Sequence, residues 1–181
     1  MADDDLSPEG KAIIDRLAAL GADFNIFRTM ARKPTALARF IEWARYILSA
    51  ENSLSPRTRE LAILRTGYNC ASGYEWAQHV VIGKREGLTD VEIARIKHGP
   101  RAAGWSAVDS VVLAACDDLN SNHFISDPTW TALVAEFSTQ QCMDLVYTVG
   151  QYTQVSMLLN SFGVQLDAGL EHDLDLDRHA I

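Results

Sequence analysis

The sequence predicts an all-α protein, and three observations support this. Helix starts are marked by capping residues, the apolar residues that follow them recur every three or four positions, and no run shows convincing strand alternation bounded by hairpin turns. The chain has 181 residues, 48% of them hydrophobic, so it can bury the core of one domain. We expect about seven or eight helices, joined by short turns at Gly21, Gly87-Leu88 and Gly99-Pro100.

The helix starts can be placed in chain order. Ser7-Pro8 and Ser55-Pro56 each combine a cap with proline at the first helical position, where its missing N–H costs nothing. Three capping boxes, in which a glutamate or glutamine follows the cap by three residues, begin at Ser72, Thr89 and Ser138. Two more helices are expected after Ser106 and after Asp127-Pro128.

Acidic residues gather at both ends of the chain. Residues 1–10 hold four acids and no base, residues 167–181 hold five acids against Arg178, and the body between them is neutral. We therefore expect acidic tails at 1–10 and 168–181, solvated and mobile, around a single domain at 11–167. The alternate leucines of DLDLD at 173–177 could instead dock on a neighbouring subunit. A neutral body argues against nucleic acid and anionic membranes as partners.

No targeting or membrane segment is evident. The start, MADDDLSPEG, has neither a basic region nor an apolar core, and the longest apolar run, VVLAAC at 111–116, is too short to cross a bilayer. Three widely spaced cysteines do not make a disulfide framework. We predict a cytoplasmic protein.

One short stretch, NCASGYEWAQH at 69–79, carries the candidate chemistry. Glu75 and His79 are four residues apart and therefore share a helix face. The positive end of the helix opposes protonation of His79 while Glu75 favours it, and such opposed influences can leave a histidine titrating near neutrality, as a general base needs. The structural alternative is a capping box at Ser72 and Glu75 beside a buried histidine whose hydrogen bonds are satisfied.

Metal and thiol chemistry find less support in the same stretch. No HExxH, ExxH or CxxC pattern is present, so we predict no metal site and no cofactor, although Asp117, Asp118 or His123 could supply further ligands. Cys70 does not share the face of Glu75 and His79. On the helix expected over 138–163, the amides of Gln151, Gln154 and Asn160 could line a pocket or a subunit interface, or could face water.

Residues 59–96, RELAILRTGYNCASGYEWAQHVVIGKREGLTDVEIARI, resemble the carboxymuconolactone decarboxylase and alkylhydroperoxidase D-like family, as does YTQVSMLLNSFGVQLD at 152–167. The resemblance covers most of residues 35–167. It implies an all-α homo-oligomer, a trimer or hexamer, with sites close to subunit contacts.

Peroxidase members of this family carry a glutamate, then a CxxC, then a histidine. At the matching positions this chain has Glu60, Ser72, Glu75 and His79. A serine and a carboxylate can form neither a sulfenic acid nor a disulfide, so hydroperoxide reduction is only an alternative function here. The resemblance adds Glu60 to Glu75 and His79 as a proton-transfer site.

We therefore expect a cofactor-independent acid–base enzyme: a lyase, in particular a decarboxylase, or an isomerase, acting on a small unsaturated or lactone carboxylic acid from aromatic catabolism. The catalytic residues would be Glu60, Glu75 and His79, and the substrate-binding residues Ser72, Tyr74, Trp76, Tyr152 and Asn160. Possible carboxylate clamps are Arg57, Arg59, Arg65 and Arg101. A non-catalytic helical oligomer that binds a ligand is a further alternative.

Overall fold

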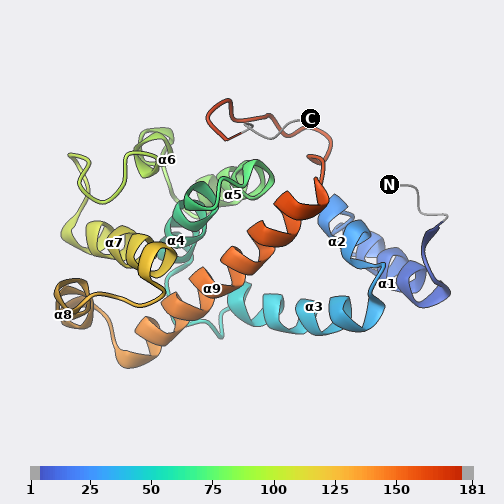
Figure 1. Ribbon diagram of the computed structural model, residues 1–181, viewed down its shortest axis with the longest axis horizontal. Coiled ribbons are helices and arrows are strands. Elements are labelled where there is room, and N and C mark those ends of the chain that lie inside the picture. The colour runs from blue at the N-terminus through green and yellow to red at the C-terminus, as the bar shows by residue number, and fades with distance from the viewer. Residues whose placement is uncertain (1–4, 177–181) are drawn as a thin grey trace.

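The computed structural model describes residues 5–176, and its regular elements in that range are nine α-helices, which confirms the all-α prediction (Figure 1). They are α1 (Pro8–Ala19), α2 (Asn25–Met30), α3 (Pro34–Leu48), α4 (Pro56–Asn69), α5 (Gly73–Arg85), α6 (Asp90–Ile96), α7 (Ala107–Asn122), α8 (Asp127–Glu136) and α9 (Thr139–Phe162). The expected number was seven or eight. The N-caps of α2 and α3 are Phe24 and Lys33, whereas each of the other seven helices has serine or threonine at this position.

Most predicted caps form as expected. The hydroxyls of five N-cap residues accept a backbone N–H, namely Ser7, Ser55, Thr89, Ser106 and Ser138. The box predicted at Ser72 is wrong. Ser72 is the N-cap of α5, but its side chain makes no capping hydrogen bond, and the Glu75 carboxylate turns to His79 instead. Helix α8 begins at Asp127, with Ser126 rather than Asp127 at the cap.

Helix α4 is at the centre of the core. It packs against α5, α7 and α9, and four consecutive side chains of its middle turn, Leu61 to Leu64, are fully buried. Helix α9 runs between the N-terminal helices α1–α3 on one side and α4–α8 on the other (Figure 1). Because α4 is buried on all sides, a polar residue on it must find its partner inside the protein.

A glycine lets α4 and α5 approach closely. A Cβ added to Gly83 of α5 would lie 3.3 Å from a Leu64 methyl group and 3.0 Å from one of Leu88. A Cβ added to Gly67 of α4 would make only an ordinary van der Waals contact with the Glu75 side chain, at 3.5 Å. This close contact brings a carboxylate of α4 within reach of α5.

A second, smaller apolar cluster joins α1, α2 and α3 around Ile14, Ala31 and Leu37. From α2 and α3, Ile26 and Phe40 also reach a cluster formed by α5 and α9, where they pack near Tyr74 and Val155. The N-terminal helices therefore cover one side of the α5–α9 contact.

The C-terminal segment is not simply solvated, as far as the structure describes it. The Lys97 ammonium lies 2.7 Å from Asp173 and 2.9 Å from Asp175, and Leu176 is 5% exposed within the main core, while Leu174 is 93% exposed. The expectation of a free tail is therefore wrong for this stretch, because an ion pair and an apolar anchor hold it on its own chain. Four charged residues of the predicted tails, Asp3, Asp4, Asp177 and Arg178, lie outside the described residues. No helix between residues 5 and 176 combines the length and apolarity that crossing a bilayer requires.

Candidate active site

Three buried side chains from two helices form a hydrogen-bonded chain. The Nδ1 atom of His79 lies 2.6 Å from Oε2 of Glu60 on α4, and its Nε2 atom lies 3.0 Å from Oε1 of Glu75, one turn earlier on α5. Glu60 is 1% exposed, Glu75 4% and His79 5%. The structure thus brings together the three residues that the sequence and the resemblance selected as catalytic.

The two carboxylates determine the protonation of the imidazole. Burial disfavours the charged ring, but the Coulombic attraction and hydrogen bonds of Glu60 and Glu75 outweigh it and raise the pKa of His79 to about 10. A neutral imidazole has one N–H and one lone pair, so it could donate to only one carboxylate. Each ring nitrogen already faces a carboxylate, which leaves neither free to coordinate a metal. Within residues 5–176 no group of three or more His, Cys, Asp or Glu side chains is arranged to hold a metal ion.

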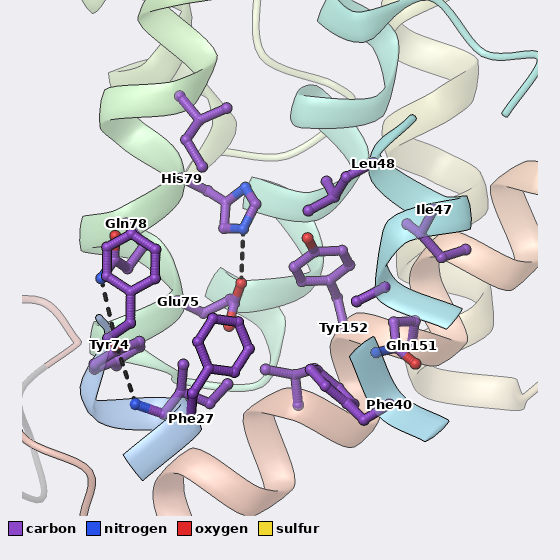
Figure 2. Close-up of a pocket in the computed structure, with 15 residues that line it drawn as sticks. Phe27, Phe40, Ile47, Leu48, Tyr74, Glu75, Gln78, His79, Gln151 and Tyr152 are labelled. Carbon is purple, nitrogen blue, oxygen red and sulfur yellow. Dashed lines mark hydrogen bonds and ion pairs between the residues drawn. The ribbon is translucent and has the colours of Figure 1, made fainter. Parts of the chain in front are cut away.

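Glu75 and His79 line a cavity of about 150 Å³ (Figure 2). Glu60 is not part of its lining. The cavity lies between α5 and α9 and is covered by α2 and α3. Its apolar walls come from Phe24, Ile26, Phe27, Phe40, Ala44, Ile47, Leu48, Ile82 and Val155, and its remaining lining from Tyr74, Gln78, Gln151 and Tyr152. An apolar concave pocket with a few converging polar groups is the usual form of a small-molecule site.

Tyr152 and Gln151 supply hydrogen-bond donors on the α9 side of the cavity. The ring of Tyr152 meets that of His79 edge-on, with centroids 4.9 Å apart (Figure 2). Burial, together with the nearby carboxylates, raises the pKa of Tyr152 well above its ordinary value, so its hydroxyl keeps its proton. The Nε2 atom of Gln151 is buried and has no hydrogen-bond partner, which is an expensive arrangement unless a ligand completes it.

Asp167, the last residue of the predicted domain, fastens α2 over the pocket. Its carboxylate accepts a hydrogen bond from the Tyr74 hydroxyl, one of 2.5 Å from Nε2 of Gln78 and one of 2.8 Å from the backbone N–H of Asn25, the first residue of α2. The contact joins residues 142 positions apart, so no local pattern could have revealed it.

Three of the predicted substrate-binding residues do not line the cavity. Ser72 is fully buried and its hydroxyl has no partner, while Trp76 packs in the main core beside Tyr68. Asn160 is exposed and donates to the backbone carbonyl of Cys70. Of the five, Tyr74 and Tyr152 are the two in the lining.

The proposed arginine clamps are engaged elsewhere. Arg57 pairs with Asp109 and Glu92, and Arg65 with Asp117 at 2.6 Å. The Arg59 guanidinium donates to the carbonyls of Ser49 and Leu48 at the end of α3. None of these, nor Arg101, lines the cavity.

The thiols have no activated character. Cys70, Cys116 and Cys142 are all free, and burial raises the pKa of each. A raised pKa reduces the thiolate fraction, which is the reactive form.

Comparison with known proteins relates the segment that carries this arrangement to a known family. Residues 34–117 match the carboxymuconolactone decarboxylase family. The similarity to that family is thus shown for this segment of the chain. The segment contains all three members of the carboxylate–imidazole–carboxylate chain. No curated protein sequence matches the chain significantly.

Solved structures with the same fold include two peroxidase-related proteins. One, from Ralstonia eutropha and described as an alkylhydroperoxidase AhpD core, has a TM-score of 0.78 at 15% identity, over 93% of this chain and 90% of its own. The other, from a Silicibacter species, has a TM-score of 0.77 at 16% identity, over 91% of this chain and 87% of its own. A variant of the debrominase Bmp8, in complex with 2,3,4-tribromopyrrole, has a TM-score of 0.72 at 10% identity, over 89% and 87%. At these identities the similarity shows the shared AhpD-like fold.

Proposed function

We propose that this protein is a cytoplasmic, cofactor-independent acid–base enzyme, a lyase or isomerase that moves a proton on a small unsaturated or lactone substrate. The observation that carries the proposal is the hydrogen-bonded chain of Glu60, His79 and Glu75, of which the last two line an apolar pocket. A positioned acid–base group contributes roughly 10²–10⁴-fold to a proton-transfer rate. The similarity to the family supports the proposal through the decarboxylase branch.

In this proposal each residue has a distinct role. Glu60 lies outside the lining and holds Nδ1 of His79, so it positions the ring. Glu75 contacts His79 through Oε1, which leaves its second oxygen to take a proton from a substrate carbon. The electron pair of that C–H bond then moves onto the substrate as an enolate, whose oxygen the Tyr152 hydroxyl can stabilise. Return of the proton to another carbon, through Glu75 and His79, completes an isomerisation.

Exchange of substrate hydrogens with deuterated water tests this proton transfer whatever the product of the full reaction is. We expect the protein to catalyse deuterium incorporation at the acidic carbon of a small unsaturated lactone such as α-angelica lactone, followed by nuclear magnetic resonance. Glu75→Gln and His79→Ala should each slow the exchange by roughly 10²-fold or more. Glu136→Gln, at an exposed position on α8, is the matched control. If folded Glu75→Gln and His79→Ala proteins exchange hydrogen as fast as the wild type, the function is wrong.

Two alternatives give different results in simple experiments. Hydroperoxide reduction, suggested by the peroxidase-related neighbours, would have to use Cys70, the most exposed thiol, and would disappear in Cys70→Ser. A non-catalytic ligand-binding protein would keep its pocket but show no exchange in any variant.

An exposed apolar stripe supports assembly into a homo-oligomer, a trimer or hexamer as in the family. Along α9 the side chains of Met143, Tyr147 and Met157 are 48%, 39% and 63% exposed, at the spacing of one helix face. Trp43 of α3, 40% exposed, packs against Tyr147 and extends the stripe. Extended apolar surface of this kind usually marks a protein contact.

A further inference from the structure

The charge of the catalytic chain can be counted from its hydrogen bonds. Two short contacts join three groups, and each contact needs one proton between its two atoms. If the imidazole carries both protons, the charges are one positive and two negative. If one carboxyl carries a proton and the ring is neutral, one negative charge remains. Glu60, His79 and Glu75 therefore sum to −1 in either arrangement.

Among residues 5–176, no cation in the lining offsets this charge. The lining contains neither lysine nor arginine, and both N–H groups of a protonated His79 already point at carboxylates. Arg59 is close enough to influence Tyr152, but it is not in the lining: its two Nη atoms donate to the carbonyls of Ser49 and Leu48, and its buried Nε has no partner. An anion in the pocket would meet the Glu75 carboxylate without a cation to pair with, and a buried, unpaired charge is costly.

The uncharged groups of the lining indicate what kind of ligand the pocket would bind. Its walls are mostly aliphatic and aromatic, and its volume of about 150 Å³ is that of a cavity able to hold a benzene-sized molecule. The Tyr152 hydroxyl and the unpartnered Gln151 amide N–H are donors, so a ligand that carries an acceptor oxygen suits this lining better than one that carries only donors.

We propose that the pocket takes a neutral carbonyl compound, of about the size of a single substituted ring, and discriminates against carboxylates. The proposal rests on the proposed function in treating this cavity as the substrate site. It replaces the carboxylic acid expected from the sequence. It also favours double-bond isomerisation or enolisation over decarboxylation, because decarboxylation requires a carboxylate as substrate.

Benzamide and benzoate form a matched pair of probes, since they share shape and differ in charge. Isothermal titration calorimetry at pH 7.5 should show benzamide binding more tightly than benzoate, by on the order of 10–100-fold for one like-charge contact at short range. Equal affinities, tighter binding of benzoate, or no detectable binding of benzamide would each overturn the proposal.

Three variants test whether the effect arises in this pocket. Glu75→Gln removes one negative charge from the pocket and should shrink the benzamide preference by about tenfold. Glu136→Gln removes the same charge from the surface of α8 and should leave the preference unchanged. Ala44→Phe fills the cavity and should abolish benzamide binding. If Ala44→Phe binds benzamide as the wild type does, or if Glu75→Gln keeps the full preference, the assignment of the ligand class to this pocket fails.

Binding and turnover separate this proposal from the proposed function. A benzamide preference in a protein that exchanges no substrate hydrogen would uphold the ligand class and refute the enzyme. Hydrogen exchange with equal binding of the two probes would uphold the enzyme and refute the ligand class.

Discussion

The protonation of His79 should make the stability of this protein depend on pH in the alkaline range. In the folded state the pKa of His79 is raised to about 10, whereas in the unfolded chain it returns to about 6.5. Between these values the folded state binds one proton more than the unfolded state. The free energy of unfolding should therefore fall by about 1.4 kcal/mol per pH unit as the pH rises through this window.

The whole effect is bounded by the size of the pKa shift. The stabilisation is fully present below about pH 6.5 and is lost as the pH rises through about 10, for a total of at most about 5 kcal/mol. This is a large fraction of the stability of an ordinary domain, which is about 5–15 kcal/mol. Loss of the His79 proton should thus be a main cause of alkaline destabilisation.

Urea unfolding followed by circular dichroism at several pH values between 7 and 10 measures this slope directly. His79→Gln removes the titrating group, so the variant should be less stable at pH 7 and should lose the slope attributable to the imidazole. His98→Gln, which removes an exposed histidine after α6, is the matched control and should keep the wild-type slope. Identical slopes in the wild type and His79→Gln would refute the protonated, doubly hydrogen-bonded imidazole.

Two further predictions concern the cover of the pocket and the surface of α9. Asp167→Ala removes the carboxylate that accepts hydrogen bonds from Tyr74 and from the first residue of α2. We therefore expect a loss of about 2 kcal/mol in the free energy of unfolding and faster amide hydrogen exchange in α2. Unchanged exchange in α2 would show that the carboxylate does not fasten this helix. Light scattering should give a mass well above the 20.0 kDa of one chain. Met157→Glu should reduce this mass, whereas the control Ala135→Glu, at an exposed position on α8, should not. A monomeric wild type would contradict the assembly.

The sequence predicted the helical architecture well because its signals are local. Caps such as Ser55 and Thr89 act within one turn, and the apolar spacing after them marks which face is buried. Phe24 and Lys33 are not typical capping residues, so the starts of α2 and α3 were not predicted from the sequence. Ser72 failed as a capping box for a different reason: its partner Glu75 binds His79 instead.

The candidate site divides in the same way. The spacing of Glu75 and His79 on one helix was readable from the chain, because residues four apart share a face. Glu60 came from the resemblance to the family. Trp76 and Asn160 were chosen for their chemical type near the motif, but the direction of a side chain depends on the packing of its helix, and theirs point away from the cavity.

The sequence by itself determined the helices, the absence of a CxxC pair and the acid–base pair on α5. Only the tertiary structure decided that Glu60 contacts Nδ1 of His79 and that Asp167 holds α2 over the pocket. It also decided that no arginine of residues 5–176 lines the pocket. Local structure follows from hydrogen bonds and apolar spacing within a few residues. The charge and shape of a pocket follow from which distant side chains share one enclosed volume, and that depends on how the helices pack.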